Sequence, residues 1–147
     1  MQPADDTTRG VTAGGDDAVP PIRVLLLEDD ALDAELLAAC LDASGFAASI
    51  ERVDTRDAFE AALARGGFDV VLSDFSLPSY DGTRALQATR ALAPDVPFLF
   101  VSGAIGEELA IESLRRGATD YVLKHRLDRL GPALRRALRE REDRIQR

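Results

Sequence analysis

The 147-residue sequence contains one cysteine and lacks any long apolar run. The lone cysteine, Cys40, cannot form a disulfide within the chain and fits a reducing compartment, so we expect a cytoplasmic protein. It lies in an apolar helical stretch, where a small buried side chain is a commoner role than a reactive thiol. No stretch approaches the roughly 18–20 apolar residues of a membrane span. The first residues also lack the basic start and apolar segment of a signal peptide, so we expect no membrane insertion.

Lysine is almost absent as well, because 17 of the 18 basic side chains are arginines and Lys124 is the only lysine. The formal net charge of -8 argues against a nucleic-acid partner for this chain. Residues 126–147 are locally basic, with eight arginines against four acidic residues. We interpret them as a solvated helix face rather than as a surface for an acidic partner.

The length predicts one domain, and the composition of the first residues predicts a tail before that domain. Residues 1–21 are rich in Asp, Thr, Gly, Ala and Pro and have almost no large apolar side chain, so we predict that they are disordered. The domain is predicted to span residues 22–140. Residues 141–147 are expected to be the end of an extended last helix or the stub of a linker.

Short apolar runs alternate with helical stretches through this domain. The predicted strands are 22–27, 47–53, 70–72, 97–101 and 119–123, of which the second is the most polar and is expected at an edge. Helices are predicted from about 32 to 44, after a cap at Asp54, after Gly82, from 106 to 117, and from Pro132 onward. Five strand–helix units in strict alternation predict an α/β fold with helices on both faces of a parallel sheet. We expect the flavodoxin-like, doubly wound arrangement of five strands in the order 2-1-3-4-5, with five helices.

Residues able to do chemistry follow four of the predicted strands: Glu28 and Asp29, Asp74, Ser102, and Lys124. In an open α/β sheet the ligand crevice lies outside the carboxyl ends of the strands. With the order 2-1-3-4-5 the three carboxylates converge, and such close like charges raise one another's pKa unless a cation intervenes. Hard oxygen ligands without a full cage favour Mg²⁺, completed by water and later by phosphate. The alternative is that each acid is a separate cap or turn residue.

The same residues suit phosphoryl transfer. A carboxylate such as Asp74 can attack phosphorus and form an acyl phosphate. Lys124 carries a compact point charge on a flexible stem and suits one phosphate oxygen, whereas arginine is a planar fork. The Ser102 hydroxyl can donate to another oxygen, and its movement toward a new phosphate would act as a switch.

Four motifs stand at these strand ends: EDD at 28–30, SDFSLPSYDG at 73–82, VSG at 101–103 and DYVLK at 120–124. Together they resemble the receiver domain of bacterial response regulators, over about residues 22–138. The resemblance implies that Asp74 is the phosphoacceptor, assisted by Mg²⁺, for which Mn²⁺ could substitute. The implied metal ligands are Asp29, Glu28 (directly or through water), Asp74 and the backbone carbonyl of Ser76. The implied phosphoryl contacts are Ser102 and Lys124, and the implied switch aromatic, which turns inward when Ser102 moves, is Tyr121.

As a receiver in a two-component or phosphorelay system, the chain would take phosphoryl from a sensor histidine kinase or a phosphotransfer protein. The signal would remodel the face formed by the fourth helix, the fifth strand and the last helix. That face would bind an output protein or an attached output module, and a homodimer through it is a further expectation. We expect autocatalytic phosphotransfer and dephosphorylation only, without small-molecule turnover.

Two other functions remain open. A receiver fold can act as a phosphorylation-independent binding module, although such chains usually lose the acceptor Asp or the Lys. An aspartyl-nucleophile phosphatase of the haloacid-dehalogenase type is disfavoured. That family carries a D-x-D pair on its first strand, whereas here the candidate nucleophile Asp74 follows the third strand and no second Asp stands two residues after it.

Three positions depart from the receiver pattern. His125 stands where Pro usually follows the Lys, so we expect a different path into the last helix and an exposed loop histidine rather than a ligand. The LPSYDG loop at 77–82 and Gly103 after the switch hydroxyl also differ from the commoner residues. Both are expected to tune the dephosphorylation rate.

Overall fold

The computed structural model describes residues 21–103 and 106–146. They contain a five-stranded sheet in the order β2-β1-β3-β4-β5, in which every neighbouring pair is parallel. The strands are β1 (Ile22–Leu27), β2 (Ala48–Val53), β3 (Val70–Ser73), β4 (Phe98–Ser102) and β5 (Asp120–Leu123). The predicted sheet order and the edge position of the second strand are confirmed.

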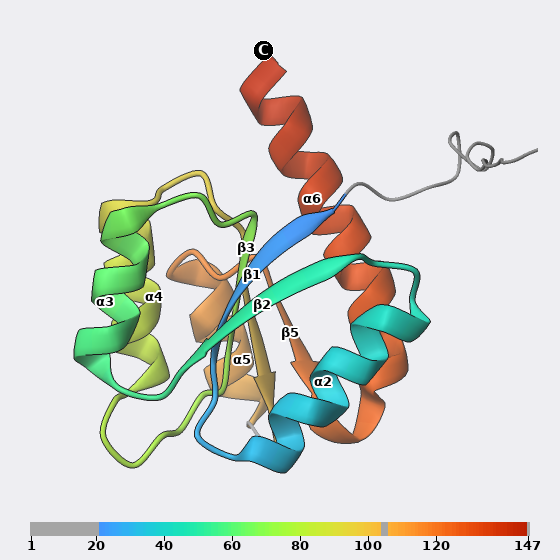
Figure 1. Cartoon of the computed structure of the whole chain (residues 1–147). Helices are drawn as coiled ribbons and strands as arrows, with labels where there is room; N and C mark the ends of the chain where they lie inside the picture. Colours follow the sequence, from blue (N-terminus) through green and yellow to red (C-terminus); the bar gives the residue numbers. More distant parts are fainter. Residues whose placement is uncertain (1–20, 104–105, 147) are drawn as a thin grey trace, which may run out of the picture.

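Helices cover both faces of this sheet. The α-helices in the described part of the chain are α2 (Ala31–Ala43), α3 (Arg56–Arg65), α4 (Gly82–Leu92), α5 (Glu107–Arg115) and α6 (Leu130–Gln146). Figure 1 shows α2 and α6 on one face and α3, α4 and α5 on the other. This is the predicted doubly wound arrangement with five helices.

Each helical layer encloses an apolar core of its own against the sheet. Along β1, Val24 and Leu26 belong to the core under α2 and α6, whereas Leu25 and Leu27 belong to the core under α3 and α4. All four side chains are at most 1% exposed. Burial on both faces explains why this strand is an uninterrupted apolar run and not an alternating one.

The cap of α3 differs from the prediction. Its N-cap is Thr55, whose side-chain oxygen accepts a hydrogen bond from the Ala58 amide at 3.2 Å. The prediction of Asp54 as this cap is therefore wrong, and Asp54 is an exposed residue before the helix. Both residue types are good N-caps and they are adjacent here, so residue preference alone does not distinguish them.

The connection from β5 to α6 is a 3₁₀ helix, η1 (Lys124–Arg129), which the sequence pattern did not indicate. His125 in this turn is exposed, as expected for a loop histidine. Cys40 packs nearby, and its thiol donates to the Leu127 carbonyl at 3.1 Å. Burial raises the pKa of the Cys40 thiol, which fits the predicted structural role.

Two expectations concern the ends of the chain. The predicted disordered tail falls almost wholly on residues 1–20, which lie outside the described residues. At the other end, α6 continues to Gln146 and projects past the sheet (Figure 1). Across residues 21–103 and 106–146, no helix has both the length and the apolar character needed to cross a membrane.

Candidate functional site

The carboxyl ends of β1 and β3 lie side by side. Leu27 pairs with Ser73 across the two strands, and the Asp74 amide donates to the Leu27 carbonyl at 2.9 Å. Asp74 therefore leaves the sheet next to Glu28. The guanidinium of Arg52 fixes this end of β1, because it donates to the Glu28 carbonyl at 2.9 Å.

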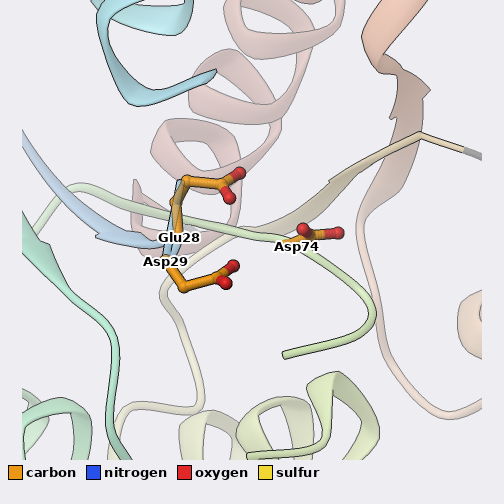
Figure 2. Close-up of side chains that lie close together, drawn as sticks. All are labelled: Glu28, Asp29 and Asp74. Carbon is orange, nitrogen blue, oxygen red and sulfur yellow. The ribbon is translucent and has the colours of Figure 1, made fainter. Parts of the chain in front are cut away.

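Three carboxylates gather at these two strand ends: Glu28, Asp29 and Asp74 (Figure 2). One oxygen atom of each lies within 4.8 Å of an oxygen of the other two. Their burial differs, because Glu28 is 1% exposed and the Asp74 side chain is 13% exposed, while Asp29 is open to solvent. We call these three residues the acidic cluster. A carboxylate set that is open on one side suits a divalent cation that keeps part of its water.

Lys124, the first residue of η1, reaches the same place. Its Nζ lies 3.1 Å from Oδ2 of Asp74, 2.9 Å from Oε1 of Glu28 and 2.7 Å from Oδ2 of Asp33. Sequence reasoning missed Asp33, which stands in the first turn of α2 and is 91 residues away from Lys124 in the chain. Its place in the helix directly after the EDD motif was the only available signal.

At Glu28 and at Lys124, burial and the neighbouring charges shift the pKa in opposite directions. Burial raises the pKa of Glu28, and the Lys124 ammonium and the Asp30 amide offset this only in part. At Lys124, burial alone would lower the pKa, but the carboxylates of Asp33, Glu28 and Asp74 raise it well above its ordinary value. One ammonium shared among several carboxylates leaves the site with an excess of negative charge, which favours a cation.

The two carboxylate oxygens of Asp74 have different partners. Oδ1 accepts a hydrogen bond from the Phe75 amide at 2.7 Å, and Oδ2 accepts one from Lys124. The loop then turns into α4, with an isolated antiparallel bridge between Ser76 and Asp81. Backbone contacts thus hold the loop that carries the expected carbonyl ligand, Ser76.

Ser102 and Tyr121 lie on the strands on the far side of Asp74. Ser102 ends β4, is 5% exposed and pairs with Leu123, the residue before Lys124. Tyr121 of β5 is 36% exposed and lines a surface hollow together with Arg136 of α6. The sheet therefore places Ser102 at the same edge as the acidic cluster, and the phenol of Tyr121 faces outward.

The sequence profile of the response regulator receiver domain matches residues 24–135, a range that includes all of the predicted site residues. The chain belongs to the response regulator receiver domain family. Receiver domains are signalling modules of two-component systems, so the resemblance noted in the strand-end motifs is confirmed.

Two curated relatives illustrate the extent of the match. Response regulator protein FleR of Pseudomonas aeruginosa is 35% identical over 102 residues, which are 69% of this chain and 21% of that protein. Transcriptional regulatory protein FixJ of Bradyrhizobium diazoefficiens is 32% identical over 121 residues, which are 82% of this chain and 58% of that protein. This chain thus matches only part of the length of these relatives.

Solved receiver domains share the fold. A CheY-like receiver domain from Methanospirillum hungatei superposes with a TM-score of 0.74 at 25% identity, covering 85% of this chain and 99% of that one. The receiver domain of a sensor histidine kinase from Pseudomonas aeruginosa, solved with a magnesium ion in its active-site cleft, gives a TM-score of 0.69 at 24% identity. That match covers 81% of this chain and 98% of the other.

Proposed function

We propose that this receiver domain accepts a phosphoryl group on Asp74 from a phosphohistidine of a sensor histidine kinase or of a phosphotransfer protein. One observation carries the proposal: Asp74 belongs to the acidic cluster and also lies 3.1 Å from the Lys124 ammonium. A nucleophilic carboxylate at a strand end, with an ammonium on one side and a set of oxygen ligands for a cation on the other, is equipped to bear a phosphoryl group.

The proposed transfer forms a bond between a carboxylate oxygen of Asp74 and phosphorus, and it breaks the phosphorus–nitrogen bond of the donor histidine. The imidazole leaves with its electron pair and takes a proton from solvent. The product places additional negative charge beside Glu28 and Asp29. Lys124 already pairs with three carboxylates, so its single charge does not balance the product, and a cation is needed.

Glu28, Asp29 and Asp74, with the backbone carbonyl of Ser76, would hold that cation as Mg²⁺, and Mn²⁺ could substitute. The fit rests on the donor set and on the buried Oε1 of Glu28, which has an ion pair with Lys124 but no hydrogen bond. When bound, the ion supplies positive charge to the phosphoryl oxygens. The magnesium ion in the cleft of the Pseudomonas aeruginosa receiver supports this assignment.

Lys124 and Ser102 would contact the phosphoryl group from the side opposite the cation. The register of β4 and β5 supports these two contacts, because Ser102 pairs with Leu123, the residue before Lys124. A shift of Ser102 toward the new phosphate would open space for Tyr121, whose ring is on the outside in this state. The face of α5, β5 and α6 would then change shape and carry the signal.

The partners follow from this role. Relatives such as FixJ are longer than this chain, so we propose that the receiver acts on an output module or on a separate output protein, with a homodimer as a further arrangement of the α5–β5–α6 face. Hydrolysis of the acyl phosphate would end the signal, without turnover of small molecules. The free Cys40 fits the reducing cytoplasm, where we place this exchange.

The test is phosphorylation of the purified chain by acetyl phosphate with Mg²⁺, followed by intact-protein mass spectrometry. The wild type should gain one phosphoryl group, and Asp74→Asn should gain none. Asp54→Asn is the matched control, because Asp54 is an exposed aspartate just past the end of the edge strand β2 and its loss should leave the phosphoryl gain intact. Equal labelling of wild type and Asp74→Asn would refute the assignment.

Binding of Mg²⁺ separates the remaining alternatives. If titration shows neither Mg²⁺ binding nor phosphorylation, the chain is a phosphorylation-independent binding module. If the wild type instead turns over a small phosphate ester through Asp74, it is a phosphatase.

A further inference from the structure

Asp33 makes the shortest contact to the only lysine of the chain. Its Oδ2 lies 2.7 Å from Nζ of Lys124, compared with 2.9 Å for Glu28 and 3.1 Å for Asp74. A lysine ammonium has three N–H donors, and here three carboxylates surround it. Asp33 is the member of this trio that comes from a helix and not from a strand end.

The three carboxylates around Lys124 do not have the same relation to the acidic cluster. Glu28 and Asp74 belong to the cluster, whereas Asp33 is not part of it. A divalent cation held by the cluster would draw on the same oxygens that now face the ammonium, and the two positive charges would repel each other. Asp33 is therefore the partner that could keep Lys124 in place while a cation is bound.

The position of Asp33 is well defined. It stands in the first turn of α2, and its backbone amide donates to the N-cap side chain of Asp30 at 3.1 Å. Its side chain is 32% exposed, so its charge costs less desolvation than that of buried Glu28. A fixed and partly hydrated carboxylate is suited to anchor an ammonium at the rim of the site.

We propose that Asp33 is a positioning residue that holds the Lys124 ammonium beside Asp74 and so lets a divalent cation occupy the acidic cluster without displacing the lysine. This role rests on the function proposed above. Without Asp33, the ammonium would pair with Glu28 and Asp74 alone and compete with the cation for their oxygens. The affinity for Mg²⁺ would fall, and the Lys124 ammonium would move away from Asp74 when Mg²⁺ binds.

A double-mutant cycle on Mg²⁺ binding tests this role by calorimetric titration. In the wild-type background, Asp33→Asn should weaken Mg²⁺ binding roughly threefold to tenfold. In the Lys124→Met background there is no ammonium to position, so the same change should cost less than about twofold, from the lost charge alone. Glu35→Gln, the same charge change at an exposed position of the same helix, should have a similarly small effect. An equal loss in both backgrounds, or no loss, would overturn the proposal.

The single lysine also gives a direct structural readout. In ¹⁵N-lysine-labelled protein the ammonium of Lys124 gives one signal, which is visible when ion pairs slow its proton exchange. With Mg²⁺ added, the signal should persist in the wild type and in Glu35→Gln and should broaden or vanish in Asp33→Asn. Persistence in Asp33→Asn would show that Asp33 is not the anchor.

These measurements are independent of phosphorylation. If the coupling is found but Asp74 accepts no phosphoryl group, the proposed function fails and the positioning role stands. If Asp74 is phosphorylated but the coupling is absent, the positioning role alone fails.

Discussion

The backbone of Gly82 packs directly against the backbone of Phe75. The Gly82 amide donates to the Phe75 carbonyl at 3.0 Å, and a Cβ on Gly82 would lie 2.7 Å from that carbonyl and 2.9 Å from the carbonyl of Asp74. Both carbonyls are backbone atoms, which cannot rotate away as a side chain can. The loop after the proposed phosphoacceptor therefore closes onto α4 through a glycine.

We predict that Gly82→Ala lowers the free energy of unfolding by about 1–3 kcal/mol, the usual cost of overpacking. Urea denaturation measures the change. Gly103→Ala is the control, because a Cβ there meets nothing within 4 Å among the described residues. An unchanged stability for Gly82→Ala would mean that the loop moves aside freely.

Lys124 stabilises the domain when no cation is bound, and its positive charge repels a cation that binds the acidic cluster beside it. Lys124→Met leaves the 1%-exposed Glu28 without its counter-charge. We expect this change to lower the stability without metal by roughly 2–3 kcal/mol, below the full range for a buried pair because the lysine is 19% exposed. Added Mg²⁺ should then raise the melting temperature more in the variant than in the wild type.

Thermal unfolding with a chelator and with Mg²⁺ checks this expectation. Arg126→Met removes the same charge from an exposed neighbour, which pairs only with Asp128 among the described residues, and should behave like the wild type. An equal response to Mg²⁺ in Lys124→Met and wild type would contradict this repulsion.

Tyr80 makes the stability depend on pH in the alkaline range. Burial, together with the hydrogen bond to Glu60, raises the pKa of Tyr80 to about 12. Its raised pKa means that the folded state holds the phenol proton more tightly than the unfolded state does. This contribution is complete below the unfolded pKa of about 10 and is lost as the pH rises toward 12, by about 2–3 kcal/mol.

Tyr80→Phe lacks this proton. As the pH rises from 9 to about 11.5, the free energy of unfolding of the wild type should therefore fall relative to that of the variant. Urea midpoints across that range provide the measurement. Parallel curves would show that the Tyr80 proton is not linked to folding.

The cap of α3 offers a direct test at two adjacent residues. Thr55→Ala removes the side-chain oxygen that accepts from the Ala58 amide and should cost about 1 kcal/mol. Asp54→Ala should leave the unfolding midpoint nearly unchanged. A larger loss of stability for Asp54→Ala than for Thr55→Ala would indicate that Asp54 is the cap.

The fold could be predicted from the sequence because its signals are local. The apolar run of β1 and the turn residues after it mark a strand that is buried on both faces, and strict alternation of strands and helices implies a parallel sheet. The convergence of Glu28, Asp29 and Asp74 then follows from sheet order alone. The strands and helices themselves are each marked by a short stretch of sequence.

The missed features depend on contacts between distant segments. The pair of Asp33 and Lys124 joins residues 91 positions apart through the packing of α2 beside η1. The 3₁₀ helix from Lys124 has no clear sequence signal of its own, and the crowding at Gly82 depends on how a loop returns to the sheet. Local preferences do not encode such distances.

Lys124 and the last helix are joined by the six-residue 3₁₀ helix η1. η1 begins at Lys124 and leads directly into α6, whose 17 residues extend about 25 Å along a straight axis. The far end of that helix projects from the side of the domain opposite the carboxyl ends of the strands (Figure 1), and the acidic cluster lies at those carboxyl ends. The last helix thus begins beside the proposed phosphorylation site, buries Leu130, Leu134 and Ala137 against the sheet, and ends about 25 Å away from its start.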